Sequence, residues 1–130
     1  MIVDHDKNQL SGGFNGFPRG IKDDGRLEER ERAIKIVVHA EANAVATAAR
    51  NGHSIKGAIL YSTHRPCPQC ASLIIQSGIV RVVTIFGQQE KSSSGVDWAP
   101  EFDFAQKLLI EAKIQVCQVE LETGYLVCKD

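Results

Sequence analysis

Val38-His39-Ala40-Glu41-Ala42-Asn43 and, further along, Pro66-Cys67-Pro68-Gln69-Cys70 are the two stretches around which the chain is organised. His39, Cys67 and Cys70 offer one imidazole nitrogen and two thiolate sulfurs, which are ligands that zinc prefers. Three protein ligands leave the fourth tetrahedral position to water, as in a catalytic zinc site. Glu41 lies two residues past the histidine. A carboxylate there is too close to be an obvious fourth ligand, but it is well placed to handle the protons of that water.

The first stretch is predicted to begin a helix. From His39 to Arg50 almost every residue favours a helix, and six alanines allow close packing. Asn51-Gly52 supplies the C-terminal stop. Glu41 then lies in the first turn, at the positive end of the helix, where a negative charge is favoured.

The second stretch is predicted to begin another helix, from about Pro68 to Gln76, because proline is common in the first helical turn. Cys67 and Cys70 stand three residues apart at its start. At that spacing both sulfurs can face one point. Both halves of the motif therefore lie at helix N-termini, where sites gather in α/β folds.

The remaining pattern predicts further strands and one more helix. In order these are a hairpin over 1–14, strands over 58–62, 79–86 and 114–121, and an amphipathic helix over 101–113. Residues 87–100 are the most loop-like stretch, and 125–128 are predicted to be an extended tail. The two later β-α-β connections should make that part of the sheet parallel. We predict a single α/β domain over 1–130, a three-layer α/β/α sandwich around a central mixed five-stranded sheet.

The composition, 43% hydrophobic and 24% charged over 130 residues, is that of one soluble globular domain. A net charge of -1 gives no long-range attraction to nucleic acid or anionic membranes. No apolar run approaches the roughly 18 residues needed to span a bilayer. Two of the four cysteines form a C-x-x-C and no signal peptide is evident, so we expect a reducing, cytoplasmic compartment.

Two other interpretations of the cysteines exist. The same three ligands could belong to a structural zinc knot closed by Cys117 or Cys128, but this leaves Glu41 and the proline unexplained. Cys67 and Cys70 could also form a redox C-x-x-C, but such a pair needs no upstream histidine and so leaves His39 unexplained. Outside a zinc knot, Cys117 and Cys128 are predicted to be buried or peripheral thiols.

The pattern H-x-E followed by P-C-x-x-C is a known signature of zinc nucleobase deaminases. Residues Gly13-Phe14-Asn15-Gly16-Phe17-Pro18-Arg19-Gly20, 39–44, 66–71 and 74–79 resemble the bacterial and phage branch of the deoxycytidylate (dCMP) deaminase family. The resemblance implies a cytidine deaminase-like fold and hydrolytic conversion of dCMP to dUMP, which feeds dTMP synthesis. It also implies one zinc per chain, with the ligands named above, and Glu41 as the proton shuttle.

The resemblance also implies a substrate site. Asn15 matches the loop asparagine near the sugar, and Asn43 matches the asparagine of the helix motif. Arg19 or Arg50 is expected to meet a phosphate. The glycines and proline of residues 15–20 give that loop a fixed shape.

Further properties follow from the same resemblance. We expect a homo-oligomer, a hexamer or a dimer, with dCTP and dTTP as regulators and Mg2+ accompanying the regulatory nucleotide. The location expected is the cytosol of a bacterium or of a phage-infected host, with neither nucleic acid nor a membrane as partner.

Two departures from the family pattern lead to further expectations. Family members carry another helix before the point where Met1 stands, so one sheet face should lack cover or be shielded by a partner subunit. The segment Ile21 to Val37 lacks the extra Cys and His residues of a second, structural zinc.

The rival interpretations are a cytidine, cytosine, guanine or tRNA adenosine deaminase, of which the last would need a basic surface.

Overall fold

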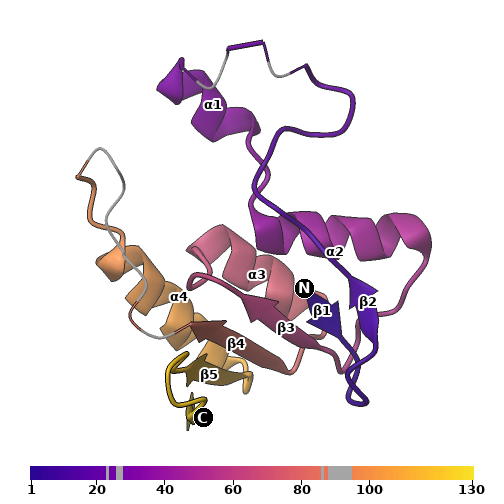
Figure 1. The fold of residues 1–130 in the computed structure, drawn as a ribbon, viewed down its shortest axis with the longest axis vertical. Coiled ribbons are helices and arrows are strands. Elements are labelled where there is room, and N and C mark those ends of the chain that lie inside the picture. Colours follow the sequence, from indigo (N-terminus) through magenta and orange to yellow (C-terminus); the bar gives the residue numbers. More distant parts are fainter. Residues whose placement is uncertain (23, 26–27, 86, 88–94) are drawn as a thin grey trace.

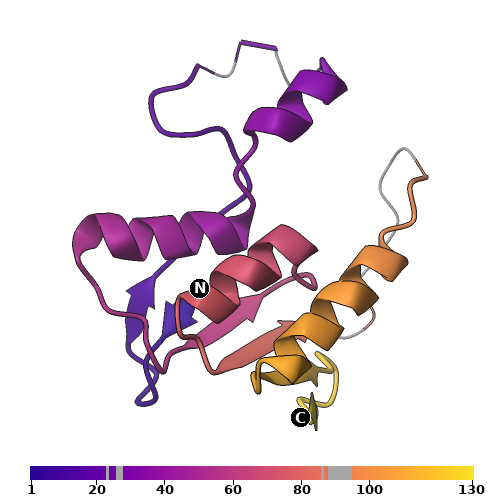
Figure 2. The ribbon, with the colours of Figure 1, turned by 180° about the vertical axis from the view of Figure 1, so that it is seen from behind.

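The chain folds around one mixed sheet of six strands, in the order β2-β1-β3-β4-β5-β6 (Figure 1). The structure is a computed structural model and describes residues 1–130 except 23, 26–27, 86 and 88–94. The elements in chain order are β1 (Ile2–Val3), β2 (Gln9–Ser11), α1 (Arg30–Ile36), α2 (Ala40–Asn51), β3 (Ile59–Ser62), α3 (Pro68–Gln76), β4 (Arg81–Ile85), α4 (Ala99–Glu111), β5 (Gln115–Val119) and β6 (Leu126–Lys129). In Figures 1 and 2, α2, α3 and α4 lie side by side on one face of the sheet, and α1 stands away from it.

The central strands β3, β4 and β5 are parallel, and β1 and β6 flank them in antiparallel pairing. Each parallel neighbour is reached through a helix, α3 and then α4, as the alternating pattern predicted. The α/β class, a mixed sheet with flanking helices, is thus confirmed.

The predicted number of five strands is wrong. The stretch predicted as a tail is β6, which pairs with β5 after a turn that includes Gly124, whose φ is 72°. Glycine adopts this left-handed conformation without strain, so the chain can reverse there and reach the open edge of β5. Residues 88–94 of the predicted loop over 87–100 lie outside the described residues, and α4 already begins at Ala99.

The core lies between the sheet and the three helices. α2 packs against α3, and α3 against α4. Small side chains on the helices, such as Ala44, Ala48 and Ala71, meet larger ones on the strands, such as Leu60 and Val82, and all are at most 1% exposed. Removal of this apolar surface from water is the main stabilising contribution to the domain.

The second face of the sheet carries a separate apolar cluster, built in the described residues from strands alone. Its members are Val3, Ile59, Val83 and Cys117, with Tyr61 and Val119 packed against them. No helix residue of the described chain belongs to it. Lack of helical cover on one sheet face was the expectation from the sequence.

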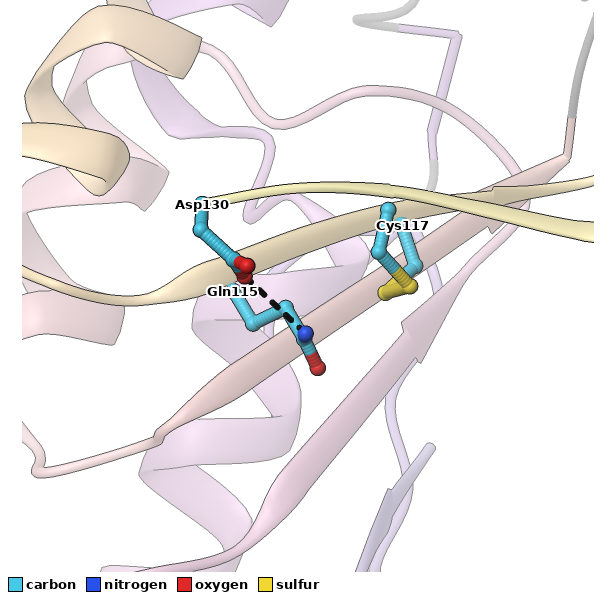
Figure 3. Close-up of a disulfide and its surroundings, with 4 residues drawn as sticks. Gln115, Cys117 and Asp130 are labelled. Carbon is cyan, nitrogen blue, oxygen red and sulfur yellow. Dashed lines mark hydrogen bonds between the residues drawn. A yellow bond between two sulfur atoms is a disulfide. The ribbon is translucent and has the colours of Figure 1, made fainter.

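Cys117 and Cys128 form a disulfide, so the prediction that they are thiols is wrong. They are direct partners in the β5–β6 register, and their Cα atoms are 4.0 Å apart. Figure 3 shows the disulfide beside a hydrogen bond from Gln115 Nε2 to Asp130 Oδ1, at 3.0 Å. This hydrogen bond joins the first residue of β5 to the residue that follows β6. The sequence did not indicate the Cys117–Cys128 pair because β6, the strand that carries Cys128, was not predicted.

Within the described ranges, none of the helices has the length and apolar character required to cross a bilayer.

Gly13 is expected to be essential for packing of the N-terminal hairpin on α2. A Cβ at this position would lie 2.3 Å from Ala40 O and 2.5 Å from Ala44 N, both backbone atoms that cannot move without shifting the helix. Gly13→Ala should lower the free energy of unfolding by about 2 kcal/mol or more, measured by urea denaturation. Gly12→Ala is the matched control, because its Cβ would meet only the side chain of Gln9, at 3.4 Å. Equal stability of the two variants would contradict this account of the contact.

Candidate active site

Three side chains with metal-ligating atoms converge where α2 and α3 begin. His39 is the N-cap residue of α2, Cys67 is the N-cap residue of α3, and Cys70 lies in the first turn of α3. The His39 Nδ1 atom is 3.3 Å from Cys67 Sγ and 3.5 Å from Cys70 Sγ. One ligand atom from each residue lies within 4.8 Å of the others.

This cluster fits a tetrahedral zinc ion. Zinc bonds of ordinary length place a sulfur and a nitrogen ligand about 3.5 Å apart, close to the two distances observed. No fourth His, Cys, Asp or Glu of the described residues joins the group. Cys117 and Cys128 are bonded to each other, so neither closes a four-ligand knot. The described residues thus offer three candidate ligands, and a tetrahedral ion held by them would have one position left for water.

The Cys70 thiol and the Cys67 sulfur shift each other's pKa in opposite directions. A hydrogen bond from the Cys70 thiol lowers the pKa of Cys67 to about 4, against the effect of burial and with help from His39. The same bond, together with burial, raises the pKa of Cys70. The hydrogen bond to Cys67 also raises the pKa of His39. One thiolate is therefore already present near neutral pH, which favours capture of a cation.

Glu41 lies in the first turn of α2, is 9% exposed, and accepts a hydrogen bond at Oε1 from Ser62 Oγ at 2.6 Å. Its negative charge contributes to the raised pKa values of His39 and Cys70, so the carboxylate is close to the ligands. A negative charge is favoured at this end of a helix.

A cavity of about 110 Å³ lies beside this carboxylate, and Gly13, Glu41, Ser62 and Thr63 are among its lining residues. For comparison, a cavity of about 150 Å³ holds benzene. The space next to Glu41 is thus on the scale of a small ring, and it opens to solvent.

The loop that begins at Gly13 is attached to α2 by side chains predicted to bind substrate. Asn15 Oδ1 accepts a hydrogen bond from Ala40 N at 2.7 Å, which satisfies an N–H of the first helical turn. Asn43 Nδ2 donates to Phe14 O at 3.0 Å. Asn15 and Asn43 thus hold the loop against the first turns of α2, the helix that His39 begins.

Arg19 reaches the same helix through Thr47. Its Nη2 donates to Thr47 Oγ1 at 3.3 Å, and Thr47 Oγ1 donates to Asn43 Oδ1, also at 3.3 Å. Arg50 lies in the last turn of α2, about 16 Å along the axis from His39 at 1.5 Å per residue. The structure therefore links Arg19 through Thr47 to Asn43, whereas Arg50 has no such link among the described contacts.

Sequence reasoning missed Thr47 and Ser62. Thr47 stands four residues after Asn43, a spacing that makes side chains neighbours on a helix, and this signal was readable. Ser62 is separated from Glu41 by 21 residues, and nothing in the local pattern links them.

The fold and the cluster define a zinc-binding α/β domain, and comparison with known proteins gives its family. The family model for the cytidine and deoxycytidylate deaminase zinc-binding region matches residues 1–86. The uncharacterized deaminase in the luxG 3' region of Aliivibrio fischeri is 33% identical over 122 residues, which cover 94% of this chain and 78% of that protein. The chain belongs to the cytidine and deoxycytidylate deaminase family.

Two phage proteins are also similar. The deoxycytidylate deaminase of Enterobacteria phage T4 is 52% identical over 58 residues, 45% of this chain and 30% of that protein. The crystal structure of dCMP deaminase from cyanophage S-TIM5 in complex with dCMP and dUMP matches with a TM-score of 0.68 at 26% identity, over 92% of this chain and 78% of that chain. The family predicted from the motifs is confirmed, and with it zinc as the metal. The chain spans less than half the length of several curated relatives that it matches.

The lowered pKa of Cys67 gives a direct test of the cluster in metal-free protein. Ultraviolet thiolate absorbance should show one thiolate per chain at pH 6, which is lost as the pH falls through about 4 and the sulfur is protonated. Cys70→Ala should raise the Cys67 pKa toward its usual range, because the donating thiol is gone. Cys117 and Cys128 contribute no signal while they form the disulfide. A titration in which no thiolate forms below pH 8 would show that the sulfurs do not interact as described.

Proposed function

We propose that residues 1–130 act as a single zinc-dependent domain that hydrolyses dCMP to dUMP and ammonia. The observation that carries the proposal is the buried carboxylate of Glu41, fixed beside an open His39-Cys67-Cys70 set and facing a cavity. The family membership and the similarity to two phage deoxycytidylate deaminases support it.

The residues of the chain account for the proton transfers. When bound by His39, Cys67 and Cys70, zinc would supply Lewis acidity that makes water a nucleophile at neutral pH. Glu41 accepts a proton from the attacking water and delivers it to N3 of the cytosine ring. C4 gains the C–O bond and loses the C–N bond. Glu41 then takes the remaining proton from the hydroxyl added at C4 and delivers it to the amino group. That group leaves as ammonia while the C4 carbonyl forms, so no other proton carrier is needed.

The substrate contacts that we propose centre on the loop at the start of α2. Asn15 and Asn43 hold that loop against the helix, and Gly13 of the same loop lines the cavity. Arg19 binds the phosphate, because it is linked through Thr47 to Asn43. Arg50 has no such link among the described contacts and lies at the opposite end of α2.

Several finer properties are part of the same proposal. We infer one zinc per chain, supply of dUMP for dTMP synthesis, and regulation by dCTP and dTTP with Mg2+. A homo-oligomer, a hexamer or a dimer, would cover the apolar cluster that no described helix covers. A cytoplasmic location fits this role, and there the Cys117–Cys128 bond would be open to reduction.

Turnover of dCMP, with Glu41→Gln as the variant, tests the reaction. The wild-type chain should deaminate dCMP faster than CMP, deoxycytidine or cytosine, followed by loss of cytosine absorbance. Glu41→Gln removes the proton carrier and should lower kcat by about 10²-fold or more, while zinc content and thermal unfolding are retained. Activity that survives this substitution would contradict the mechanism, and equal turnover of deoxycytidine would contradict the substrate.

Arg19→Ala compared with Arg50→Ala tests the phosphate contact. Loss of a charge-assisted hydrogen bond should raise KM for dCMP about 10-fold in Arg19→Ala, with kcat less affected. KM for deoxycytidine, which lacks the phosphate, should not change. Arg50→Ala removes the same charge from the last turn of α2 and should leave both KM values near wild type. The reverse ranking would assign the phosphate to Arg50.

A further inference from the structure

Ser62 contacts Glu41, the proposed proton carrier, and the mechanism described above assigns no role to this contact. It is the last residue of β3 and is half-buried, and its Oγ donates to Glu41 Oε1 at 2.6 Å. We propose that Ser62 is a positioning residue, which holds Oε1 and thereby leaves Oε2 for water and substrate. This inference rests on the proposed function, because it assigns a role to Ser62 through Glu41.

The sheet fixes the position of Ser62. Ser62 lies opposite Thr84 in the register of the parallel β3–β4 pair. Residues two apart on a strand point to the same face, so Ser62 points to the side on which Leu60 enters the core beneath the helices. Glu41 comes from the first turn of α2 on that side. The hydroxyl and the carboxylate therefore belong to two separate elements, neither of which is a loop.

The hydrogen bond is short enough to orient the carboxylate. An O–H donor to a carboxylate lies typically about 2.5–2.7 Å away, and the Ser62–Glu41 distance falls in this range. Among the described residues Oε1 of Glu41 has this one hydrogen-bond donor, whereas no donor to Oε2 is present. A free glutamate side chain rotates about three bonds. A hydrogen bond that fixes one carboxylate oxygen therefore excludes many orientations in which the carboxylate would not face the cavity.

A hydroxyl suits this position because it can donate to Oε1 without adding a charge beside the carboxylate. When Oε2 carries the transferred proton, Oε1 can still accept the hydrogen bond from Ser62. The contact then persists through the reaction without a change of partner.

The alternative is that Ser62 has a purely structural role. Its hydroxyl would then only provide a hydrogen-bond donor to the buried carboxylate, and its loss would not affect turnover. Ser62→Thr and Ser62→Val separate the two roles, because Thr and Val have nearly the same shape and both suit a strand. The two variants narrow the cavity equally and differ in the hydroxyl.

We expect kcat for dCMP to be about 10-fold lower in Ser62→Val than in Ser62→Thr, which corresponds to one lost hydrogen bond to a charged group. KM for dCMP and zinc content should agree within about two-fold between them, because neither the phosphate contact nor the ligands change. Equal kcat values for the two variants would overturn the proposal. If Ser62→Val does not fold, Ser62→Ala replaces it in the same comparison with Ser62→Thr.

Thermal unfolding of the zinc-loaded protein provides a second measurement that does not depend on the substrate. With Glu41 present, Ser62→Val should unfold about 4 °C or more below Ser62→Thr. In a Glu41→Met background, which lacks the carboxylate, this difference should disappear. A difference that persists with Met at position 41 would overturn the contact. If wild type fails to deaminate dCMP, the proposed function is wrong, while this cycle still decides whether Ser62 holds Glu41.

Discussion

The proposed zinc site depends on the convergence of one imidazole nitrogen with two sulfurs, at 3.3 and 3.5 Å. Neither helix could supply the set alone, since His39 begins α2 and the cysteines begin α3. The packing of α2 on α3 and of both on the sheet brings these two helix starts together. The alanine-rich face of α2 makes this possible, because small side chains permit a close approach.

The polar groups around the cluster are hydrogen-bonded to helices and strands whose positions the core fixes. Asn15 caps α2 and so attaches its own loop to the helix that carries Glu41. Ser62 approaches the same carboxylate from β3. A site built from rigid elements can hold its groups within the narrow limits that proton transfer requires. The cavity is thus defined on several sides by backbone whose position the core fixes.

The local parts of this arrangement were predictable from the sequence, and the parts formed by distant residues were not. The helix over Pro68–Gln76 was predicted with its observed bounds, because proline at the start and Ser77-Gly78 at the end are local signals. The three ligands were identified by residue type and spacing. The Ser62–Glu41 contact and the Cys117–Cys128 bond depend on strand register, which no local pattern encodes. For the same reason β6 was predicted as a tail. The choice between Arg19 and Arg50 stays a prediction.

The central claim is an open zinc site with one nitrogen and two sulfur ligands from the chain. X-ray absorption at the zinc edge, together with the metal content of the purified protein, tests it most directly. The account predicts one zinc per chain, with two sulfurs at about 2.3 Å and two nitrogen or oxygen ligands at about 2.0 Å. Three or four sulfur ligands, or a folded protein that does not bind zinc, would contradict it.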